Sequence, residues 1–275
     1  MPEARIPGEA TIPAVSPGRG RAQRQRSIAD LVRARGFVSV EELVGELGVS
    51  RMTIHRDLDE LVGRQEIQRV RGGASAERSA TFESDFSARE IECRAEKLAI
   101  ARTAATLINE GDALILGDSS TVALIAEHMA AFDQLTVITN SAPVLDAVAN
   151  ADGVHLVCLG GDFDRRHRAF LGLLCEQALT SLHADTLFVS SSALMGGSVM
   201  HQDERIVRVK QAMMRAAATK VLLLDHTKIG AGAVHKVAST VDFDYVIVDD
   251  RTDPGHVAEL RDLGVTVLVA PVTDE

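Results

Sequence analysis

The sequence predicts an α/β protein in two parts, an N-terminal winged helix-turn-helix and a larger C-terminal Rossmann-like α/β domain with a mostly parallel sheet. Three observations predict this. Short stretches with apolar residues at helical spacing, separated by glycines, fill residues 24–61. Continuous apolar runs alternate with helical stretches over residues 113–270, as in a parallel sheet covered on both faces. The charge is also divided: residues 1–73 carry 12 Lys/Arg against 10 Asp/Glu, and residues 74–275 carry 17 against 29.

The composition excludes several classes of protein. The net charge of −10 argues against general attraction to nucleic acid or a membrane surface. The N-terminal part (the front domain below) is mildly basic and the C-terminal part (the rear domain below) is acidic, which indicates that the two parts have different partners. The sequence has one Tyr and no Trp, so aromatic stacking on bases is not expected to be the main mode of recognition. No run of 18 apolar residues occurs, so no transmembrane helix is expected. Three cysteines without CxxC spacing fit reduced thiols in a cytoplasmic protein.

Residues 1–21 are predicted to be a disordered leader. Four of the seven prolines fall in the first seventeen residues, and charges stand where a signal peptide needs an apolar core. A misassigned start codon is the alternative explanation of this segment.

Two helices open the front domain, which we place at residues 22–75. Apolar residues recur at helical spacing from Arg24 to Arg35, and Gly36 follows where helices commonly stop. Ser39, with Glu42 three residues later, is the capping-box signature of a second helix, which Gly48 ends.

A third helix carries the candidate DNA-reading residues. Its inner face is Ile54, Leu58 and Leu61, and the basic and hydroxyl side chains of its first turns lie off that face. The start of such a helix enters the major groove, and residues 66–75 predict a β wing beside it. We expect DNA contacts from Ser50, Arg51, Thr53, His55, Arg56, Arg69 and Arg71. Ordinary solvated charges are the alternative, but the cap, the glycine turn and the wing together favour DNA.

The rear domain is placed at residues 87–275, after a polar linker at residues 76–86 with Phe82 and Phe86 as possible anchors. One long amphipathic helix is expected from about Ser87 to Asn109. Seven apolar runs then predict the strands of a parallel sheet: 113–117, 135–139, 154–160, 186–190, 221–225, 245–249 and 265–270.

Polar residues follow several of these strands. Ligands of open α/β sheets lie beyond the carboxyl ends of the strands. Three successive hydroxyl residues before a helix exceed what one cap needs and suit an anion such as phosphate, for which a lysine is a partner. The candidate effector-binding residues are Asp118, Ser119, Ser120, Thr121, Thr139, Asn140, Ser141, Gly160, Gly161, Lys210, Asp225 and Lys228.

Other polar clusters predict no site. Residues 165–168, three arginines around His167, are expected to be a solvated loop, with a pocket border or a subunit interface as alternatives. His201 and Asp203 show no metal-ligand spacing, and the HExxH, GxSxG and Walker motifs are absent. We therefore expect no metal and no cofactor.

The front motifs resemble the DNA-binding domain of the DeoR family of bacterial transcription regulators. The resemblance is carried by "VS-x-x-TI-x-RDL-x-x-L" at Val49–Leu61 and "RVRGGA" at Arg69–Ala74. His55 departs from it, because many members carry arginine there.

The rear motifs resemble the effector domain of the same family, and the resemblance spans residues 22–270. They are "GDSST", "TNS", "GG-x-F", "VK-x-x-M" and "DHTKIG". The resemblance implies a fold similar to sugar-phosphate isomerases and a sensor for a phosphorylated sugar or related metabolite. Residues 193–195 replace a Gly-Ile-Asp-like stretch of other members, which leaves the ligand's identity open.

These features favour a cytoplasmic transcription regulator, expected to be a repressor of carbohydrate metabolism genes. It would bind a double-stranded operator as a dimer or tetramer and respond to a phosphorylated sugar. One alternative is an enzyme resembling a sugar-phosphate isomerase, with Asp118 or Asp225 as general base and a DNA-binding appendage. Another is an architectural DNA-binding protein whose rear domain only oligomerises.

Overall fold

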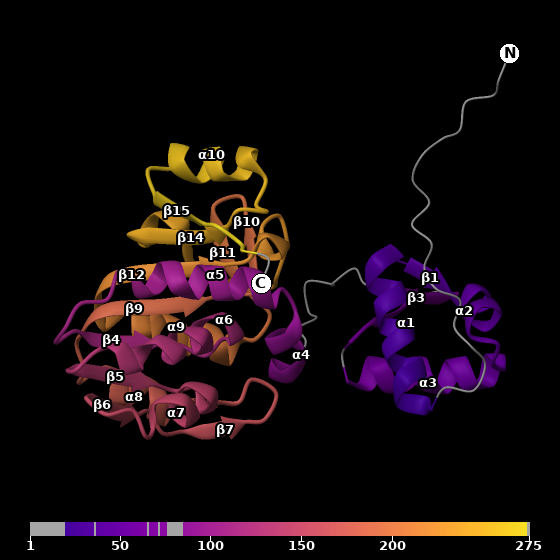
Figure 1. Ribbon diagram of the computed structural model, residues 1–275, viewed down its shortest axis with the longest axis horizontal. Helices are drawn as coiled ribbons and strands as arrows, with labels where there is room; N and C mark the ends of the chain where they lie inside the picture. The colour runs from indigo at the N-terminus through magenta and orange to yellow at the C-terminus, as the bar shows by residue number, and fades with distance from the viewer. Residues whose placement is uncertain (1–19, 36, 65, 71, 76–84, 274–275) are drawn as a thin grey trace, which may run out of the picture. The chain divides into compact units, whose positions relative to one another are not determined.

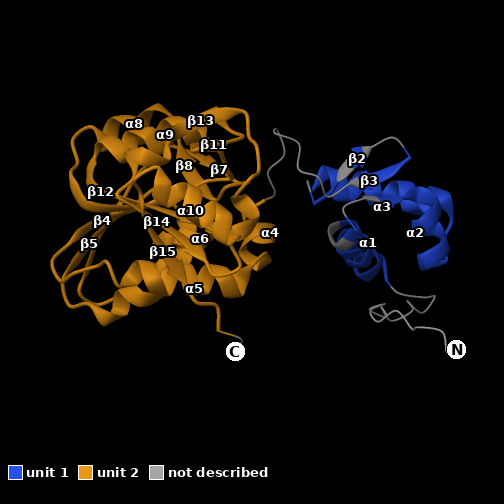
Figure 2. Ribbon diagram, turned by 90° about the horizontal axis from the view of Figure 1, so that it is seen from above, with its two compact units in different colours: residues 1–78 blue, residues 79–275 orange. Residues whose placement is uncertain are grey.

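The computed structural model describes residues 20–35, 37–64, 66–70, 72–75 and 85–273. The chain divides into two compact units, residues 1–78 and 79–275 (Figure 2). The expected leader lies outside the described residues up to residue 19. Arg21, which the sequence prediction gave to the leader, instead begins the first helix.

The first unit is a small helical domain with a three-stranded sheet. Its described elements are α1 (Arg21–Arg35), β1 (Phe37–Ser39), α2 (Val40–Leu47), α3 (Arg51–Gly63), β2 (Gln68–Val70) and β3 (Gly73–Ser75). The strands are antiparallel in the order β1-β3-β2. This is the predicted winged helix-turn-helix, with β1 as a strand that the sequence did not signal.

Local capping places α2 and α3. The Ser39 hydroxyl accepts a hydrogen bond from the Glu42 N–H at 3.2 Å, and the Glu42 carboxylate accepts one from the Ser39 N–H at 2.7 Å. The predicted capping box is therefore confirmed. Gly48 ends α2 with a left-handed φ of 63°, a conformation that favours glycine. The Ser50 hydroxyl accepts from the Thr53 N–H at 3.2 Å and caps α3.

The predicted inner face of α3 is buried, and one acidic residue on that face joins α3 to α1. The apolar residues of the face are Ile54, Leu58 and Leu61. The buried Asp57 carboxylate accepts hydrogen bonds from Arg24 Nε at 2.5 Å and Gln25 Nε2 at 3.1 Å. These polar contacts fix the position of α3 against α1.

The second unit is built around a sheet. Its described elements are α4 (Phe86–Ile91), α5 (Arg94–Ala105), β4 (Ala113–Leu116), α6 (Ser120–Ala123), the 3-10 helix η1 (Leu124–Ala131), β5 (Leu135–Thr139), α7 (Ala142–Val148), β6 (Val154–Cys158), β7 (Asp162–Asp164), β8 (Ala169–Leu171), α8 (Leu173–Leu179), β9 (Ala184–Ser190), β10 (Ala193–Met195), β11 (Ser198–His201), α9 (Glu204–Arg215), β12 (Ala217–Leu224), η2 (His226–Lys228), β13 (His235–Ser239), η3 (Thr240–Asp242), β14 (Tyr245–Asp249), α10 (Pro254–Asp262) and β15 (Thr266–Ala270).

The seven predicted strands form one parallel sheet in the order β15-β14-β12-β9-β4-β5-β6 (Figure 1). Side chains alternate between its faces. Leu114 and Leu116 of β4 join the core formed with α5, α6, η1 and α7, while Ile115 joins the core formed with α8, α9 and α10. Burial on both faces explains why the strands are continuous apolar runs.

The single helix predicted from Ser87 to Asn109 is wrong. Glu92 is extended and Cys93 is left-handed with φ 49°, so the chain turns between α4 and α5. Phe86 is buried, and its N–H donates to the Arg166 carbonyl at 2.9 Å. Tertiary contacts of α4 thus override a continuous helical periodicity.

Two small antiparallel sheets are absent from the sequence prediction, the β7–β8 hairpin and the sheet β10-β11-β13. Gly161 leads into β7 with φ 142°, and a Cβ there would lie 2.4 Å from the Leu171 carbonyl oxygen. This glycine is therefore required by the hairpin's own backbone.

Candidate functional site

The candidate DNA-binding residues lie at the start of α3 and on the wing. Ser50, Arg51 and Arg56 are exposed, and Thr53 and His55 are half-buried. The Ser50 hydroxyl also lies 2.9 Å from the Thr53 hydroxyl. Both hydroxyls therefore already serve the helix cap.

Side-chain contacts tie the wing to α3. Arg69 of β2 contacts His55 Nδ1 and lies 3.1 Å from the Asp59 carboxylate. Arg51 forms an ion pair with Glu41 of α2. Exposed pairs of this kind contribute only about 0.2–1 kcal/mol, so a DNA phosphate can replace the acidic partner.

Arg56 differs from these arginines. It is exposed, and among the described residues it makes no hydrogen bond or ion pair. Its guanidinium is therefore available for the bidentate contact that arginine makes with guanine in the major groove. Arg71, the other wing residue predicted to bind DNA, lies outside the described residues.

The second candidate site lies at the carboxyl edge of the parallel sheet. β5 and β6 extend the sheet on one side of β4, whereas β9 pairs with β4 on the other side. Ligands of open α/β sheets bind at such a change of strand order. Asp118 follows β4, Asn140 follows β5 and Asp225 follows β12, so three predicted residues converge at this edge.

The hydroxyl-rich turn after β4 is buried. The Ser119 hydroxyl accepts from the Val122 N–H at 2.8 Å and caps α6. The helix expected here is one short α-helical turn that η1 continues. Ser120 and Thr121 are also buried and are not needed for this cap.

A buried ion pair joins this turn to α9. Lys210 Nζ lies 3.2 Å from an Asp118 carboxylate oxygen and 3.2 Å from the Asp118 carbonyl oxygen. Both side chains are almost fully buried, at 1% and 2% exposure. Lys210, the weaker candidate in the sequence, is therefore held at the site.

Lys97 of α5 also reaches this edge, although the sequence analysis missed it. Its ammonium donates to Ser120 Oγ at 3.1 Å and to the Arg89 carbonyl. Burial lowers the pKa of Lys97 to about 8, against an opposing attraction from Asp225. Lys97 has no ion pair among the described residues, so neutral oxygens alone accept its hydrogen bonds.

Asp225 and Lys228 are held together after β12. Lys228 Nζ lies 4.0 Å from an Asp225 carboxylate oxygen, and the Thr227 N–H donates to the other oxygen at 3.1 Å. Burial opposes ionisation, but Lys228 and the Thr227 hydrogen bonds hold the pKa of Asp225 below its usual value. This pair also acts electrostatically on Lys97.

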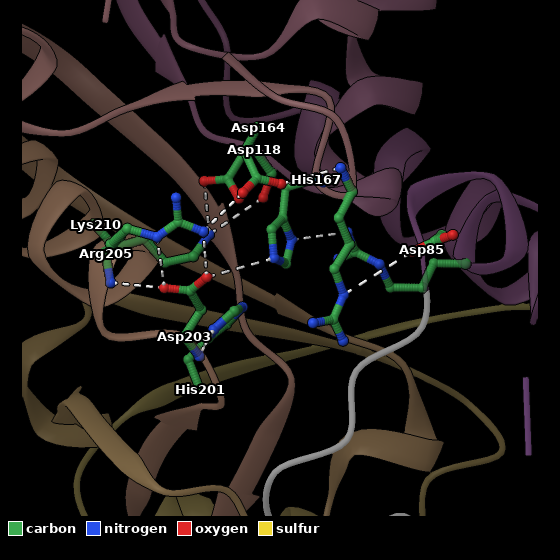
Figure 3. A network of polar contacts seen from close by, with 10 residues as sticks. Asp85, Asp118, Asp164, His167, His201, Asp203, Arg205 and Lys210 are labelled. Atoms are coloured by element: carbon green, nitrogen blue, oxygen red, sulfur yellow. Dashed lines mark hydrogen bonds and ion pairs between the residues drawn. The ribbon is translucent and has the colours of Figure 1, made fainter. Parts of the chain in front are cut away.

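The basic loop at residues 165–168 is only partly solvated, which corrects the expectation of a solvated loop for His167: Arg165 is exposed, Arg166 and Arg168 are half-buried, and His167 is buried. His167 is 1% exposed and lies 4.0 Å from Asp203 (Figure 3). Arg205 donates to Asp203 at 2.9 Å and to Asp164 at 2.7 Å. Within the loop, Arg166 lies 3.9 Å from Asp85 and Arg168 lies 3.1 Å from Asp146, so other carboxylates offset these two arginines.

Side chains of α4 contact the same loop. Arg89 of α4 lies 3.3 Å from His167 Nδ1. The guanidinium groups of Arg89 and Arg168 each lie 5.9 Å from the ring centre of Phe86. With the Lys97 bond to the Arg89 carbonyl, these contacts hold α4 beside the strand-end residues.

Two buried polar atoms after β5 have no hydrogen-bond partner among the described residues: Asn140 Oδ1 and Ser141 Oγ. Thr139, in contrast, donates to the Leu116 carbonyl at 2.7 Å and accepts from the Ser141 N–H. Thr139 therefore joins β5 to β4. A buried acceptor without a donor costs about 1–3 kcal/mol, so these two atoms suit a ligand that carries hydroxyl groups.

The predicted effector residues separate into two groups. Those after β4, β5 and β12 gather at one sheet edge with Lys210. Gly160 and Gly161 lead into β7, where the close approach to Gly161 comes from the protein's own backbone.

The sequence does carry a signal for Lys97, which the sequence analysis missed. Lys97 is spaced with Ile100 and Ala104 along the buried stripe of α5.

None of the described helices is long and apolar enough to cross a membrane. Across the same residues, no group of three or more His, Cys, Asp or Glu side chains could hold a metal ion.

The chain is similar to several bacterial regulators. It is 31% identical to the uncharacterized HTH-type transcriptional regulator YulB of Bacillus subtilis (strain 168), over 92% of this chain and 98% of that protein. It is 31% identical to the HTH-type transcriptional repressor GlcR of the same strain, over 90% and 95%. It is 36% identical to the lactose phosphotransferase system repressor of Staphylococcus aureus (strain N315), over 76% and 84%.

Among solved structures, the chain is similar to a ribose 5-phosphate isomerase A from Methanocaldococcus jannaschii, with a TM-score of 0.35 and 17% sequence identity. The similarity covers 48% of this chain and 53% of the isomerase chain. Two family models match, a DeoR-like helix-turn-helix domain over residues 24–80 and a DeoR C terminal sensor domain over residues 92–250. These matches favour a regulator over the isomerase-like enzyme. The chain belongs to the DeoR family of bacterial transcription regulators.

Proposed function

We propose that this chain is a repressor of a sugar-metabolism operon. Residues 22–75 bind a double-stranded operator, residues 87–275 sense a phosphorylated sugar, and residues 76–86 link them. The names of two relatives support this, a transcriptional repressor and a repressor of a lactose phosphotransferase system. We further propose that it acts in the cytoplasm as a dimer or tetramer, and that Arg56 is the foremost of the predicted DNA contacts.

Lys97 is the observation that carries the ligand proposal. Lys210 and Lys228 each lie beside a carboxylate, whereas the hydrogen bonds of Lys97 end on neutral oxygens. A buried ammonium whose hydrogen bonds reach no anionic oxygen is destabilised, even with the more distant attraction of Asp225. A phosphate group that accepts from Ser120 and Lys97 would supply that charge.

The hydroxyl groups of the ligand are assigned to the end of β5. Asn140 Oδ1 needs a donor, and Ser141 Oγ can donate or accept. A sugar phosphate carries both hydroxyl donors and an anionic group, so it satisfies Lys97 and these two atoms together. Inorganic phosphate would offset only the charge of Lys97, because it carries no sugar hydroxyl groups for Asn140 and Ser141.

α4 is the proposed link between the ligand and the operator. Lys97 donates to Ser120 at the site and to the Arg89 carbonyl on α4. A phosphate that draws Lys97 toward Ser120 weakens one of the contacts of α4. The chain turns at Cys93 after α4, and the linker to the first unit precedes α4. Ligand binding thereby favours one arrangement of α4 over another.

A two-step experiment tests this function. The full chain is screened by thermal shift against phosphorylated sugars and the matching unphosphorylated sugars, since ligand binding raises the unfolding temperature. Operator DNA is selected from random duplexes, and its affinity is measured with and without the stabilising sugar phosphate. Ser120→Ala should lose the thermal shift. A surface control, Lys236→Met, should keep it.

The same experiment separates the architectural alternative. A protein whose rear unit only oligomerises would bind DNA and show no stabilisation by any sugar phosphate. Such a result would remove the sensor from the proposal and leave the DNA-binding part intact.

A further inference from the structure

The outward face of α3 carries an exposed methionine. The buried residues of this helix are Ile54, Asp57, Leu58 and Leu61. With 3.6 residues per turn, Met52 and Arg56 fall on the opposite side of the helix, one above the other. Met52 is 66% exposed, so its thioether is accessible to a molecule that meets this face of α3.

The side chains around Met52 are occupied by contacts within the protein. Arg51 pairs with Glu41, the Thr53 hydroxyl lies against that of Ser50, and His55 contacts Arg69 of the wing. Met52 and Arg56 are therefore exposed residues of the first two turns of α3 whose side chains make no hydrogen bond or ion pair among the described residues.

We propose that Met52 determines part of the sequence specificity by packing against the 5-methyl group of a thymine in the major groove. This rests on the proposed function, in which α3 enters that groove. The thymine methyl is the apolar group that the major groove presents, and the flexible thioether of methionine adapts to such a contact.

The position of this thymine follows from helix geometry. Met52 and Arg56 are separated by about 6 Å along the helix axis, which is about two base-pair steps. The thymine contacted by Met52 therefore lies within about two base pairs of the guanine contacted by Arg56.

Methyl deletion tests this contact. In the selected operator, each thymine is replaced in turn by deoxyuridine, which removes only the 5-methyl group. For the full-length wild type, at least one replacement should weaken binding about three- to fivefold, the value of one buried methyl group. Met52→Ala should bind the thymine and uracil operators equally, and Met52→Leu should keep the difference. Met195→Ala, which alters another exposed methionine, should behave as wild type.

The Arg56→Ala variant separates a failure of this proposal from a failure of the proposed function. If Arg56→Ala weakens operator binding while Met52→Ala still distinguishes thymine from uracil, the methionine contact is overturned and α3 remains the reader. If the wild type is indifferent to every thymine methyl, the contact is likewise overturned. If neither variant changes operator binding, the placement of α3 in the groove fails as well.

Discussion

Lys97 should make the affinity for a sugar phosphate depend on pH between 7 and 9. Burial lowers the pKa of Lys97 to about 8, so about 90% of the side chain is charged at pH 7 and about 10% at pH 9. The phosphate group is already a dianion in this range, since its second pKa is about 6. If only the charged lysine binds it, the Kd should rise about tenfold from pH 7 to pH 9.

Calorimetric titration with the sugar phosphate found by screening measures this effect. Repeating it in two buffers of different ionisation enthalpy gives the number of protons taken up on binding. Lys97→Met should bind weakly and without this pH dependence, and Lys236→Met should retain it. A wild-type Kd that is constant from pH 7 to pH 9, or an equal rise in Lys97→Met, would refute the assignment.

Three further outcomes are expected. Asp118→Ala should lower the free energy of unfolding by about 3–5 kcal/mol, because the Lys210 charge stays buried without its partner. The double variant with Lys210→Met should recover most of this in urea denaturation, and no recovery would argue against the pair. Wild-type stability should rise by about 3 kcal/mol from pH 8 to 10.5, where the unfolded chain binds the Lys97 proton more tightly, and Lys97→Met should lack this rise. Ser50→Ala should destabilise the first unit by about 1 kcal/mol in thermal unfolding, and an unchanged melting temperature would mean the cap is unimportant.

The sequence predicts the central sheet well because each strand is buried on both faces. A continuous apolar run such as residues 245–249 then has few other interpretations. The caps of α2 and α3 are equally local, since Ser39 and Ser50 bond within three residues. The β7–β8 hairpin escapes prediction because its strands have three residues each, too few to show a period.

The rest depends on tertiary contacts. No glycine or proline stands at Cys93, so the sequence does not signal the interruption between α4 and α5. His167 stands among arginines, which suggests a solvated loop, and only the fold brings Asp203 and Arg89 of α4 against that segment. The gathering of residues after β4, β5 and β12 is predictable from parallel strands, whereas their pairing with Lys210 and Lys97 is not.

Operator affinity with and without bound sugar phosphate tests the central claim most directly, namely that occupancy of the strand-end site changes DNA binding. Fluorescence anisotropy on the full chain should show the operator Kd change by about 5- to 150-fold at saturating ligand, the usual range of allosteric coupling. Ser120→Ala should keep its operator affinity and lose this change. The same operator Kd for the free and the ligand-saturated wild type would contradict the account.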